Sequence, residues 1–426
     1  MLHTSTDKTL NSWISVPQES DFPLQNIPFG IAAKASCQPK VCTRIGDTVI
    51  DLSVLASEGY FQNLDAKVLE SFDKQALNDY IALGSEVWSS VRERLITLFS
   101  EDNPELRDNK AIASKILSPL GENVMYLPVR IGDYTDFYSS MEHASNVGMM
   151  FRDPANALLP NWKHIPVGYH GRSSSIVVSG TNIHRPKGQI KFPDAPSPIF
   201  SPTRKLDFEL EMAFIVGKNN SLGDSVSVDV AENHIFGMLI FNDLSARDIQ
   251  NWEYVPLGPF LSKNFGSVVS PWVVTMEALQ PFKTAGPVQE TEVLPYLKFS
   301  GDKSYDIKLE VCLQPEGDVP QEICESNHKY LYWNISQQLA HHTVNGCNLN
   351  IGDLCASGTI SGPEPGSFGS MLEICWNGSK PLVLNDGKTR TFIDDKDTII
   401  MKAFAVKDGL RIGFGECATT ILPAKS

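Results

Sequence analysis

The feature that most constrains this chain is an alternation of acidic and apolar residues in the sequence LDFELEMAF, residues 206–214. A period of two is the pattern of a β-strand, so we expect a strand over residues 206–216 with Asp207, Glu209 and Glu211 on one face. Side chains on one face of a strand lie roughly 7 Å apart. Only Lys205, at the edge of this stretch, could share that face and offset the three carboxylates.

Three interpretations of these acids stay open from the sequence. They could form the solvated face of an antiparallel strand, or they could pair with basic groups on neighbouring strands. They could also bind a hard divalent cation through oxygen atoms alone. Further acids stand at the ends of predicted elements, beside histidine and amide side chains suited to acid–base chemistry. These neighbours favour the metal site.

The composition predicts a globular protein of two or more domains, because a chain of 426 residues, 42% of them hydrophobic, is too long for one ordinary core. A formal charge of −14, without a run of Lys and Arg, argues against a nucleic-acid-binding surface.

Apolar stretches such as residues 235–241 are too short to cross a bilayer, and residues 1–10 lack a secretory segment. Eight scattered cysteines without C-x-x-C spacing indicate free thiols, so we expect a cytoplasmic protein with no membrane partner.

Short-range patterns predict a mainly β, α+β protein with domains over residues 1–125 and 126–426. The first domain contains short strands around a Gly46-Asp47 turn and a helical repeat over residues 77–98, broken at Gly84. The second is dominated by short strands between Gly and Pro turns, which is typical of a rolled or barrelled β architecture. Its expected strands cover residues 175–179, 206–216, 234–242, 272–275, 307–313, 353–357, 371–376, 399–405 and 411–415. One helix, around residues 332–342, ends at Asn345-Gly346.

Acidic, phenolic and imidazole side chains crowd residues 131–143, just past the expected domain boundary. If this segment is helical, Asp136 and His143 share one face, two turns apart, and line one cavity. An imidazole with a pKa of about 6.5 is the usual general base at neutral pH, although a lone histidine is more often a structural donor. We assign the pair His341-His342 a structural role and no catalytic one, because it falls in the last turn of the expected helix, where imidazolium complements the helix dipole.

Polar groups also gather after the apolar run at residues 236–241, where Asp243, Arg247 and Gln250 follow. The mouth of a buried strand is a common place for a ligand site. Lys263 ends a Pro-stiffened loop, and a single lysine is by default a surface amine. The Gly/Ser-rich segment 357–373 could bind an anion, but such segments more often only turn. Neither a G-x-G-x-x-G fingerprint, a P-loop nor a G-x-S-x-G elbow is present, which argues against nucleotide cofactors and an α/β serine hydrolase.

Five segments together resemble the fumarylacetoacetate hydrolase family: DYTDFYSS (133–140), NALLPNW (156–162), VGYHGR (167–172), NDLSARDIQ (242–250) and ASGTISG (356–362). The resemblance runs from about residue 21 to about residue 423. It implies an N-terminal SH3-like barrel domain, a C-terminal β-roll catalytic domain and a homodimer. It also implies hydrolysis of the carbon–carbon bond of 4-fumarylacetoacetate, a diketo dicarboxylic acid, to fumarate and acetoacetate, the last step of tyrosine and phenylalanine breakdown.

The resemblance further implies roles for single residues at matching motif positions. His143 looks like the base that activates water, and Glu373 like the carboxylate that orients it. The residues similar to the ligands of a principal Ca²⁺ are Asp136, Glu209, Glu211 and Asp243, which leaves Asp207 outside that set. Those that match a second, Mg²⁺-like site are Asp243, Lys263 and Ser267, where the family usually has threonine at the last position.

Two further groups of residues carry over in the same way. Those similar to the groups that receive developing negative charge are Arg247, Gln250 and Lys263. Those that match substrate contacts are Tyr138, Arg152, Gln250, Tyr254 and Thr359.

Two rival functions stay open. A related acylpyruvate hydrolase or a metal-dependent decarboxylase would use the same acidic site with a differently shaped pocket. Alternatively, the acids could form a calcium site that only braces a β-rich binding module. Such a module would not need a histidine–glutamate pair or Lys263 in the same cavity.

Overall fold

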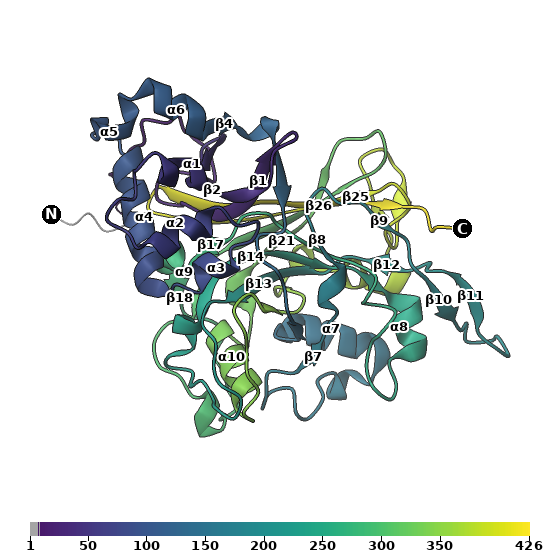
Figure 1. Cartoon of the computed structure of the whole chain (residues 1–426). Helices are drawn as coiled ribbons and strands as arrows, with labels where there is room; N and C mark the ends of the chain where they lie inside the picture. Colours follow the sequence, from purple (N-terminus) through teal and green to yellow (C-terminus); the bar gives the residue numbers. More distant parts are fainter. Residues whose placement is uncertain (1–6, 8) are drawn as a thin grey trace.

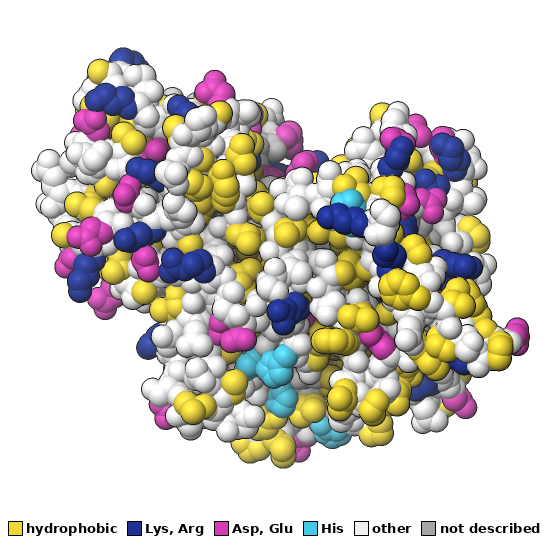
Figure 2. Space-filling model, turned by 45° about the vertical axis from the view of Figure 1, so that its right-hand side comes forward, with side chains coloured by type: hydrophobic (Ala, Val, Ile, Leu, Met, Phe, Trp, Pro, Cys, Tyr) yellow, Lys and Arg dark blue, Asp and Glu magenta, His cyan; other side chains and the backbone are white. Residues whose placement is uncertain are grey.

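The computed structural model describes residue 7 and residues 9–426, which form a strand-rich mixed α/β fold (Figure 1). Residues 1–10, in which no secretory segment is expected, lie mostly outside this described part. Among the described residues, no helix is long and apolar enough to span a bilayer. All eight cysteines are free, as expected. On the face drawn in Figure 2, Lys and Arg side chains are interspersed with Asp and Glu.

The N-terminal part is an antiparallel sheet accompanied by helices, which lie at the upper left of Figure 1. The strand order is β4-β3-β2-β1-β5. The strands are β1 (Phe29–Lys34), β2 (Lys40–Ile45), β3 (Thr48–Asp51), β4 (Leu117–Pro119) and β5 (Asn123–Tyr126). The helices are α1 (Leu52–Ser57), α2 (Ala66–Phe72), α3 (Asn78–Ile81), α4 (Ser85–Phe99), α5 (Pro104–Arg107) and α6 (Lys110–Ile116). The expected break at Gly84 is confirmed, because its φ of 88° ends the helical path between α3 and α4.

The central sheet carries most of the candidate site and has the order β7-β6-β22-β13-β14-β16-β8, with β17 paired to β14. Its strands are β6 (Tyr134–Phe137), β7 (Gly168–His170), β8 (Ile176–Val178), β13 (Leu210–Val216), β14 (Ile235–Asp243), β16 (Ser267–Val269), β17 (Val274–Thr275) and β22 (Leu354–Ala356). Strands β13 and β14 are buried along their whole length, as expected of apolar runs in the middle of a sheet. The longer helices of this part are α7 (Met141–Phe151), α8 (Arg247–Glu253) and α10 (Ile335–Thr343).

A second sheet has the order β21-β20-β25-β26-β9. Its strands are β9 (Ile183–His184), β20 (Lys308–Gln314), β21 (Gln321–Asn327), β25 (Thr398–Lys407) and β26 (Leu410–Leu422). Burial alternates along β20, and its inward residues share one hydrophobic core with Met238 and Ile240 of β14. Strand β26 also reaches the N-terminal part, because Gly413 donates its N–H to the carbonyl of Asp21 at 2.8 Å (Figure 1).

Small elements complete the fold around these sheets. Four strand pairs form separate ladders: β10 (Lys187–Ile190) with β11 (Ile199–Pro202), β12 (Leu206–Asp207) with β15 (Ser245–Ala246), β18 (Lys283–Thr284) with β19 (Ser304–Tyr305), and β23 (Leu382–Val383) with β24 (Thr389–Arg390). The remaining α-helices are α9 (Met276–Leu279) and α11 (Met371–Ile374).

Two expected elements differ in the structure. The strand expected over residues 206–216 is divided, because β12 pairs with β15 in a ladder of its own and only β13 joins the central sheet. The strand expected over residues 371–376 is wrong, since this segment begins with the helix α11. The carboxylate of Asp207 accepts the N–H groups of Met371 and Leu372, and the hydroxyl of Ser370 accepts that of the third helical residue. A local apolar pattern cannot reveal a partner that lies 164 residues away.

An aromatic cluster joins the N-terminal helices to the central sheet. The ring of Phe236 in β14 lies with its centroid 6.0 Å from that of Phe29 in β1, 6.0 Å from Tyr80 in α3 and 5.0 Å from Trp88 in α4. Aromatic pairs at such separations add to the stability gained from burying their area. The cluster therefore fixes how the two parts of the chain pack.

We expect Phe236→Ala to lower the free energy of unfolding by about 3 to 5 kcal/mol, because the ring is only 1% exposed and its loss leaves a cavity at this junction. Phe200→Ala is the matched control, since Phe200 in β11 is 72% exposed and its loss should change stability by less than about 0.5 kcal/mol. Urea unfolding followed by circular dichroism measures both. Equal effects of the two substitutions would contradict this account of the junction.

Candidate active site

Four carboxylates from separate segments meet at one end of the central sheet. Asp136 lies in β6, Glu209 immediately precedes β13, Glu211 lies within β13, and Asp243 ends β14. One oxygen atom of each carboxylate lies within 4.8 Å of those of the others, and all four side chains are buried. Strand pairing creates this group, since β22 runs parallel to β6 and lies between it and β13, while β14 pairs with the other edge of β13.

Two basic side chains offset part of this negative charge. Lys263, in the loop before β16, contacts Glu209 with its ammonium group and lies 2.7 Å from Asp243 Oδ2. Arg247, at the start of α8, lies 2.8 Å from a carboxylate oxygen of Asp207 and 2.8 Å from one of Glu209. The solvated strand face is therefore wrong, because the acids are buried. Pairing with basic groups is confirmed for Asp207 and Glu209, although their partners come from a helix and a loop rather than from a neighbouring strand.

The remaining charge fits a bound cation. Two carboxylate oxygens, Asp136 Oδ1 and Glu211 Oε1, are buried and find no hydrogen-bond donor among the described residues. An unpaired buried acceptor is costly, and hard divalent cations bind carboxylate oxygens. The acidic group could therefore bind a metal ion. The other oxygen of Glu211 accepts the N–H of Gly358 at 3.0 Å, which holds this carboxylate in place.

The pKa values divide the four acids into two kinds. Burial, with the negative charges of its neighbours, raises the pKa of Asp136 and that of Glu211 well above their ordinary values. Burial also raises the pKa of Asp243, against the nearby charge of Lys263. Burial alone would raise the pKa of Glu209 too, but the charges of Lys263 and Arg247 outweigh it and lower this pKa to about 2. Asp136 and Glu211 thus lack the compensation that Glu209 has.

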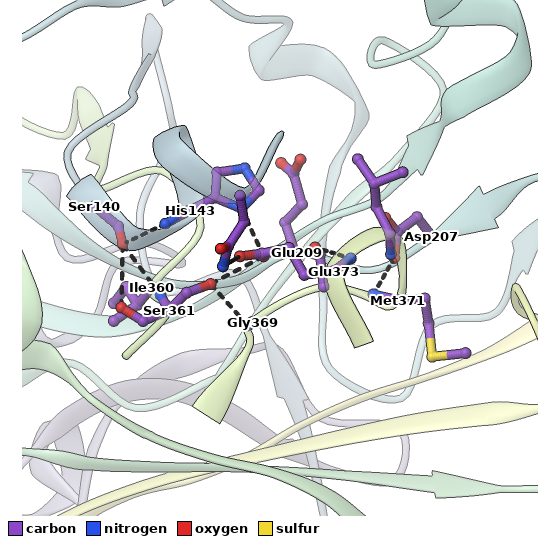
Figure 3. A network of polar contacts seen from close by, with 12 residues as sticks. Ser140, His143, Asp207, Glu209, Ile360, Ser361, Gly369, Met371 and Glu373 are labelled. Atoms are coloured by element: carbon purple, nitrogen blue, oxygen red, sulfur yellow. Dashed lines mark hydrogen bonds and ion pairs between the residues drawn. The ribbon is translucent and has the colours of Figure 1, made fainter. Parts of the chain in front are cut away.

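A buried histidine–glutamate pair lies beside the acids (Figure 3). The Nδ1 atom of His143, in α7, lies 2.6 Å from Glu373 Oε2, in α11. Three donors fix the same glutamate: Asn146 Nδ2 at 3.0 Å, Ser361 Oγ at 2.9 Å and Ser370 Oγ at 2.8 Å. Burial would raise the pKa of Glu373, but the charge of His143 and these hydrogen bonds outweigh it and lower this pKa.

The shared helix face expected for Asp136 and His143 is wrong. Asp136 lies in a strand, and His143 lies in α7, which begins at Met141 after the capping side chain of Ser140. The pair His341-His342 lies in the last turn of α10, as expected.

Three other expected site residues lie around this centre. Ser267 donates its hydroxyl to Asp243 Oδ1 at 2.7 Å, and Gln250 in α8 accepts from Arg247 at 3.3 Å. Thr359 is buried in the irregular segment after β22, next to Gly358, whose N–H binds Glu211. Ser267 therefore contacts the acids directly, Thr359 follows the residue that binds Glu211, and Gln250 is connected to the acids through the Arg247 guanidinium.

Tyr138, Arg152 and Tyr254 are less directly placed. The charges of Glu373, Glu209, Arg247 and Arg152 all act on the Tyr138 hydroxyl, whose pKa is raised mainly by burial, so this phenol lies among the site residues. Arg152, at the end of α7, donates to the carbonyl of Ala157 at 2.6 Å. Tyr254, just after α8, is 52% exposed. The structure therefore brings Tyr138 to the centre, while the Tyr254 side chain is largely open to solvent.

Comparison with known proteins finds similarity over nearly the whole chain. Residues 25–128 match the family model described as fumarylacetoacetase N-terminal, and residues 134–422 match that described as fumarylacetoacetate (FAA) hydrolase C-terminal. The chain is 52% identical to the fumarylacetoacetase of Dictyostelium discoideum over 423 residues, which covers 97% of this chain and 98% of the relative. It is 50% identical to those of Rattus norvegicus and Homo sapiens, with 97% of this chain and 99% of each relative covered.

The chain belongs to the fumarylacetoacetate hydrolase family. A solved structure, the fumarylacetoacetate hydrolase from psychrophilic Exiguobacterium antarcticum, is similar with a TM-score of 0.52 at 16% identity, covering 94% of this chain and 100% of that chain. At this identity the likeness concerns the fold alone.

Some contacts of this family member were not foreseen from its sequence. Tyr169, in β7, donates its hydroxyl to Asp243 Oδ2 at 3.3 Å, and Asn146 fixes Glu373 from one turn beyond His143 on α7. Tyr169 lies inside the VGYHGR segment, so the family motif marks its position without giving its role. The spacing of His143 and Asn146, three residues apart in a helix, could have suggested that both face one partner.

Metal binding should depend on pH in a direction that the pKa shifts fix. A carboxyl whose pKa is raised on folding stabilises the fold at low pH, and this contribution is lost as pH rises through the raised pKa. Asp136 and Glu211 are of this kind, so the metal-free protein should lose stability as pH rises above about 4. The low pKa of Glu209 adds stability that is lost as pH falls toward 2, so it does not change the trend above about pH 4.

A bound cation favours the ionised carboxylates, so it should remove the loss of stability that the metal-free protein shows as pH rises. We therefore expect the rise in melting temperature caused by added Ca²⁺, relative to chelator-treated protein, to be larger at about pH 8 than at about pH 5. Glu211→Gln should diminish the rise at the higher pH, because it removes one of the four carboxylates that could hold the ion. A rise that is independent of pH would contradict this assignment of the acids.

Proposed function

We propose that this protein is a metal-dependent fumarylacetoacetase, a hydrolase that cleaves 4-fumarylacetoacetate to fumarate and acetoacetate in the last step of tyrosine and phenylalanine catabolism. The observation that carries the proposal is the buried His143–Glu373 pair beside the four carboxylates, in a chain about half identical to named fumarylacetoacetases over nearly its whole length. A calcium site that only braces a binding module would need no such pair.

The His143–Glu373 pair activates water in this proposal. Because Nδ1 of His143 faces Glu373, Nε2 is the nitrogen left to take a proton from water. Glu373 keeps the imidazole in one orientation and stabilises the positive charge that it gains. The oxygen of that water joins the acyl carbon that becomes a carboxylate of fumarate, and the departing carbon of acetoacetate takes up a proton.

The principal metal is Ca²⁺, held by Asp136, Glu209, Glu211 and Asp243. Carboxylate oxygens are its usual ligands, and the unpaired oxygens of Asp136 and Glu211 support this assignment. A cation bound there would supply positive charge against the negative charge that develops on the diketo substrate. A second, Mg²⁺ site would use Asp243, Ser267 and Lys263. The ammonium group of Lys263 has no lone pair, so only the backbone carbonyl of this residue could serve there.

Arg247, Gln250 and Lys263 receive the negative charge that develops on the substrate. The positions of these residues support this role, since Arg247 and Lys263 are buried at the acids and Gln250 contacts Arg247. The residues proposed to contact the diketo dicarboxylic acid are Tyr138, Arg152, Gln250, Tyr254 and Thr359.

The proposal extends to the organisation of the protein. We assign residues 1–125 to an SH3-like barrel domain and residues 126–426 to a β-roll catalytic domain, and we expect a homodimer in the cytoplasm. The two matched family regions, 25–128 and 134–422, support two domains, and the free cysteines suit a reducing compartment.

The direct test is to incubate the purified, Ca²⁺-supplemented protein with fumarylacetoacetate and to follow the loss of absorbance of the conjugated diketone. We expect fumarate and acetoacetate in equal amounts. An acylpyruvate offered at the same concentration should be hydrolysed far more slowly. Preferred hydrolysis of the acylpyruvate would assign the protein to a different activity within the family, and no turnover of either substrate would refute the proposal.

The catalytic pair should act as one unit. Glu373→Gln should lower kcat by a factor on the order of 10² to 10⁴ with little change in KM, because the lost interaction strengthens only as His143 becomes charged. His143→Asn should be at least as damaging. The double variant should lose much less than the product of the two separate losses, and a loss equal to that product would show that the two residues act independently.

A further inference from the structure

Asp207 is a buried carboxylate that lies outside the four-carboxylate group and has its own set of donors. Its side chain is fully buried. Oδ1 accepts the N–H of Met371 at 2.7 Å, while Oδ2 accepts the N–H of Leu372 at 3.1 Å and Arg247 Nε at 2.8 Å. Figure 3 shows Asp207 close to Met371, on the side of Glu209 away from His143.

These donors belong to two separate parts of the candidate active site. Met371 and Leu372 begin α11, the helix that carries Glu373, whose carboxylate lies 2.6 Å from His143. Arg247 begins α8, and its guanidinium also lies 2.8 Å from Glu209. Asp207 thus contacts Arg247 directly, and it contacts the first two residues of the short helix that carries Glu373.

The local fold explains how Asp207 reaches both partners. The β12–β15 ladder places Asp207 opposite Ser245, and Arg247 follows two residues later as the chain turns into α8. On the other side, Glu209 forms an isolated bridge with Ser370, which brings the start of α11 alongside the same segment. Because β12 pairs with β15 and ends before β13 begins, Asp207 lies at the junction of the two helices while Glu209 lies among the acids.

We infer that Asp207 is a positioning residue that holds Arg247 and helix α11 in a fixed relation. The carboxylate of Asp207 then fixes the position of Arg247, which receives negative charge, relative to Glu373, which orients the base. The inference rests on the proposed function, because it concerns the rate of that reaction.

The donor count explains why a carboxylate is needed at this position. Three N–H groups point at the two oxygens of Asp207, and each oxygen serves as an acceptor. Asparagine has one oxygen and one NH₂ group. In either orientation of its amide, the NH₂ group would face at least one of these N–H groups, and the guanidinium would lose its negative partner.

The test is Asp207→Asn compared with Asp397→Asn. Asp397 is a close match, because it is 1% exposed and its Oδ2 accepts Arg390 Nε at 2.8 Å and the N–H of Asp394 at 3.0 Å, apart from the site residues. With activity normalised to folded protein, Asp207→Asn should lower kcat about 10- to 100-fold and change KM less than about threefold. Asp397→Asn should keep kcat within about twofold while losing comparable thermal stability.

Two measurements separate positioning from general damage. Hydrogen exchange of the amides in residues 370–374 should be faster in Asp207→Asn and unchanged in Asp397→Asn. In a Glu373→Gln background, the kinetic cost of Asp207→Asn should shrink, because one of the groups that it positions is already lost. If Asp207→Asn does not fold, Asp207→Glu keeps the charge but moves it by one methylene, and it should show the same kcat loss and faster exchange.

Each outcome decides one claim. An active wild type with an equally active Asp207→Asn variant would overturn the inference, as would unchanged exchange at residues 370–374 or an undiminished cost in the Glu373→Gln background. Inactive wild type and Asp397→Asn proteins would instead refute the proposed function. The exchange measurement needs no activity, so it still supports or overturns the contact between Asp207 and α11 in that case.

Discussion

The burial of like charges at one end of the central sheet is the constraint on which the site depends. Asp136, Glu209, Glu211 and Asp243 lie within reach of one ion and out of contact with bulk water. Such a group stays ionised only when positive charge enters it, because ionised carboxylates are costly to bury without a partner and otherwise take up protons. Lys263 and Arg247 supply part of that charge. The remainder is what makes the group suited to a divalent cation.

The sheet makes this arrangement rigid. Both β13 and β14 are buried from end to end, and their side chains share cores with the second sheet and with the N-terminal helices. Acids at the ends of such strands cannot move apart to relieve their repulsion without disturbing that packing. A scaffold of this kind keeps the carboxylates close together at the cost of some stability, which a bound ligand can restore.

The sequence predicted the local elements and the identities of the site residues better than their partners. Period-two spacing located β13, the apolar run located β14, and Gly84 marked the break before α4. The family motifs named His143 and Glu373, which the structure places 2.6 Å apart although 230 residues separate them. Periodicity could not show that β12 leaves the central sheet, or that residues 371–374 are helical, because both depend on contacts between distant segments.

The partners of each carboxylate decide what it can do. Glu209 and Glu373 face cations or several hydrogen-bond donors, and their pKa values are lowered despite burial, so they remain ionised and can hold a charged neighbour. Asp136 and Glu211 face mainly other acids, and their pKa values are raised well above the ordinary range. One fold thus contains carboxylates that keep their charge through the protein itself and carboxylates that need an added ion to do so. The difference lies in the two basic residues, Arg247 of α8 and Lys263 of the loop that follows it, which contact Glu209 but neither Asp136 nor Glu211.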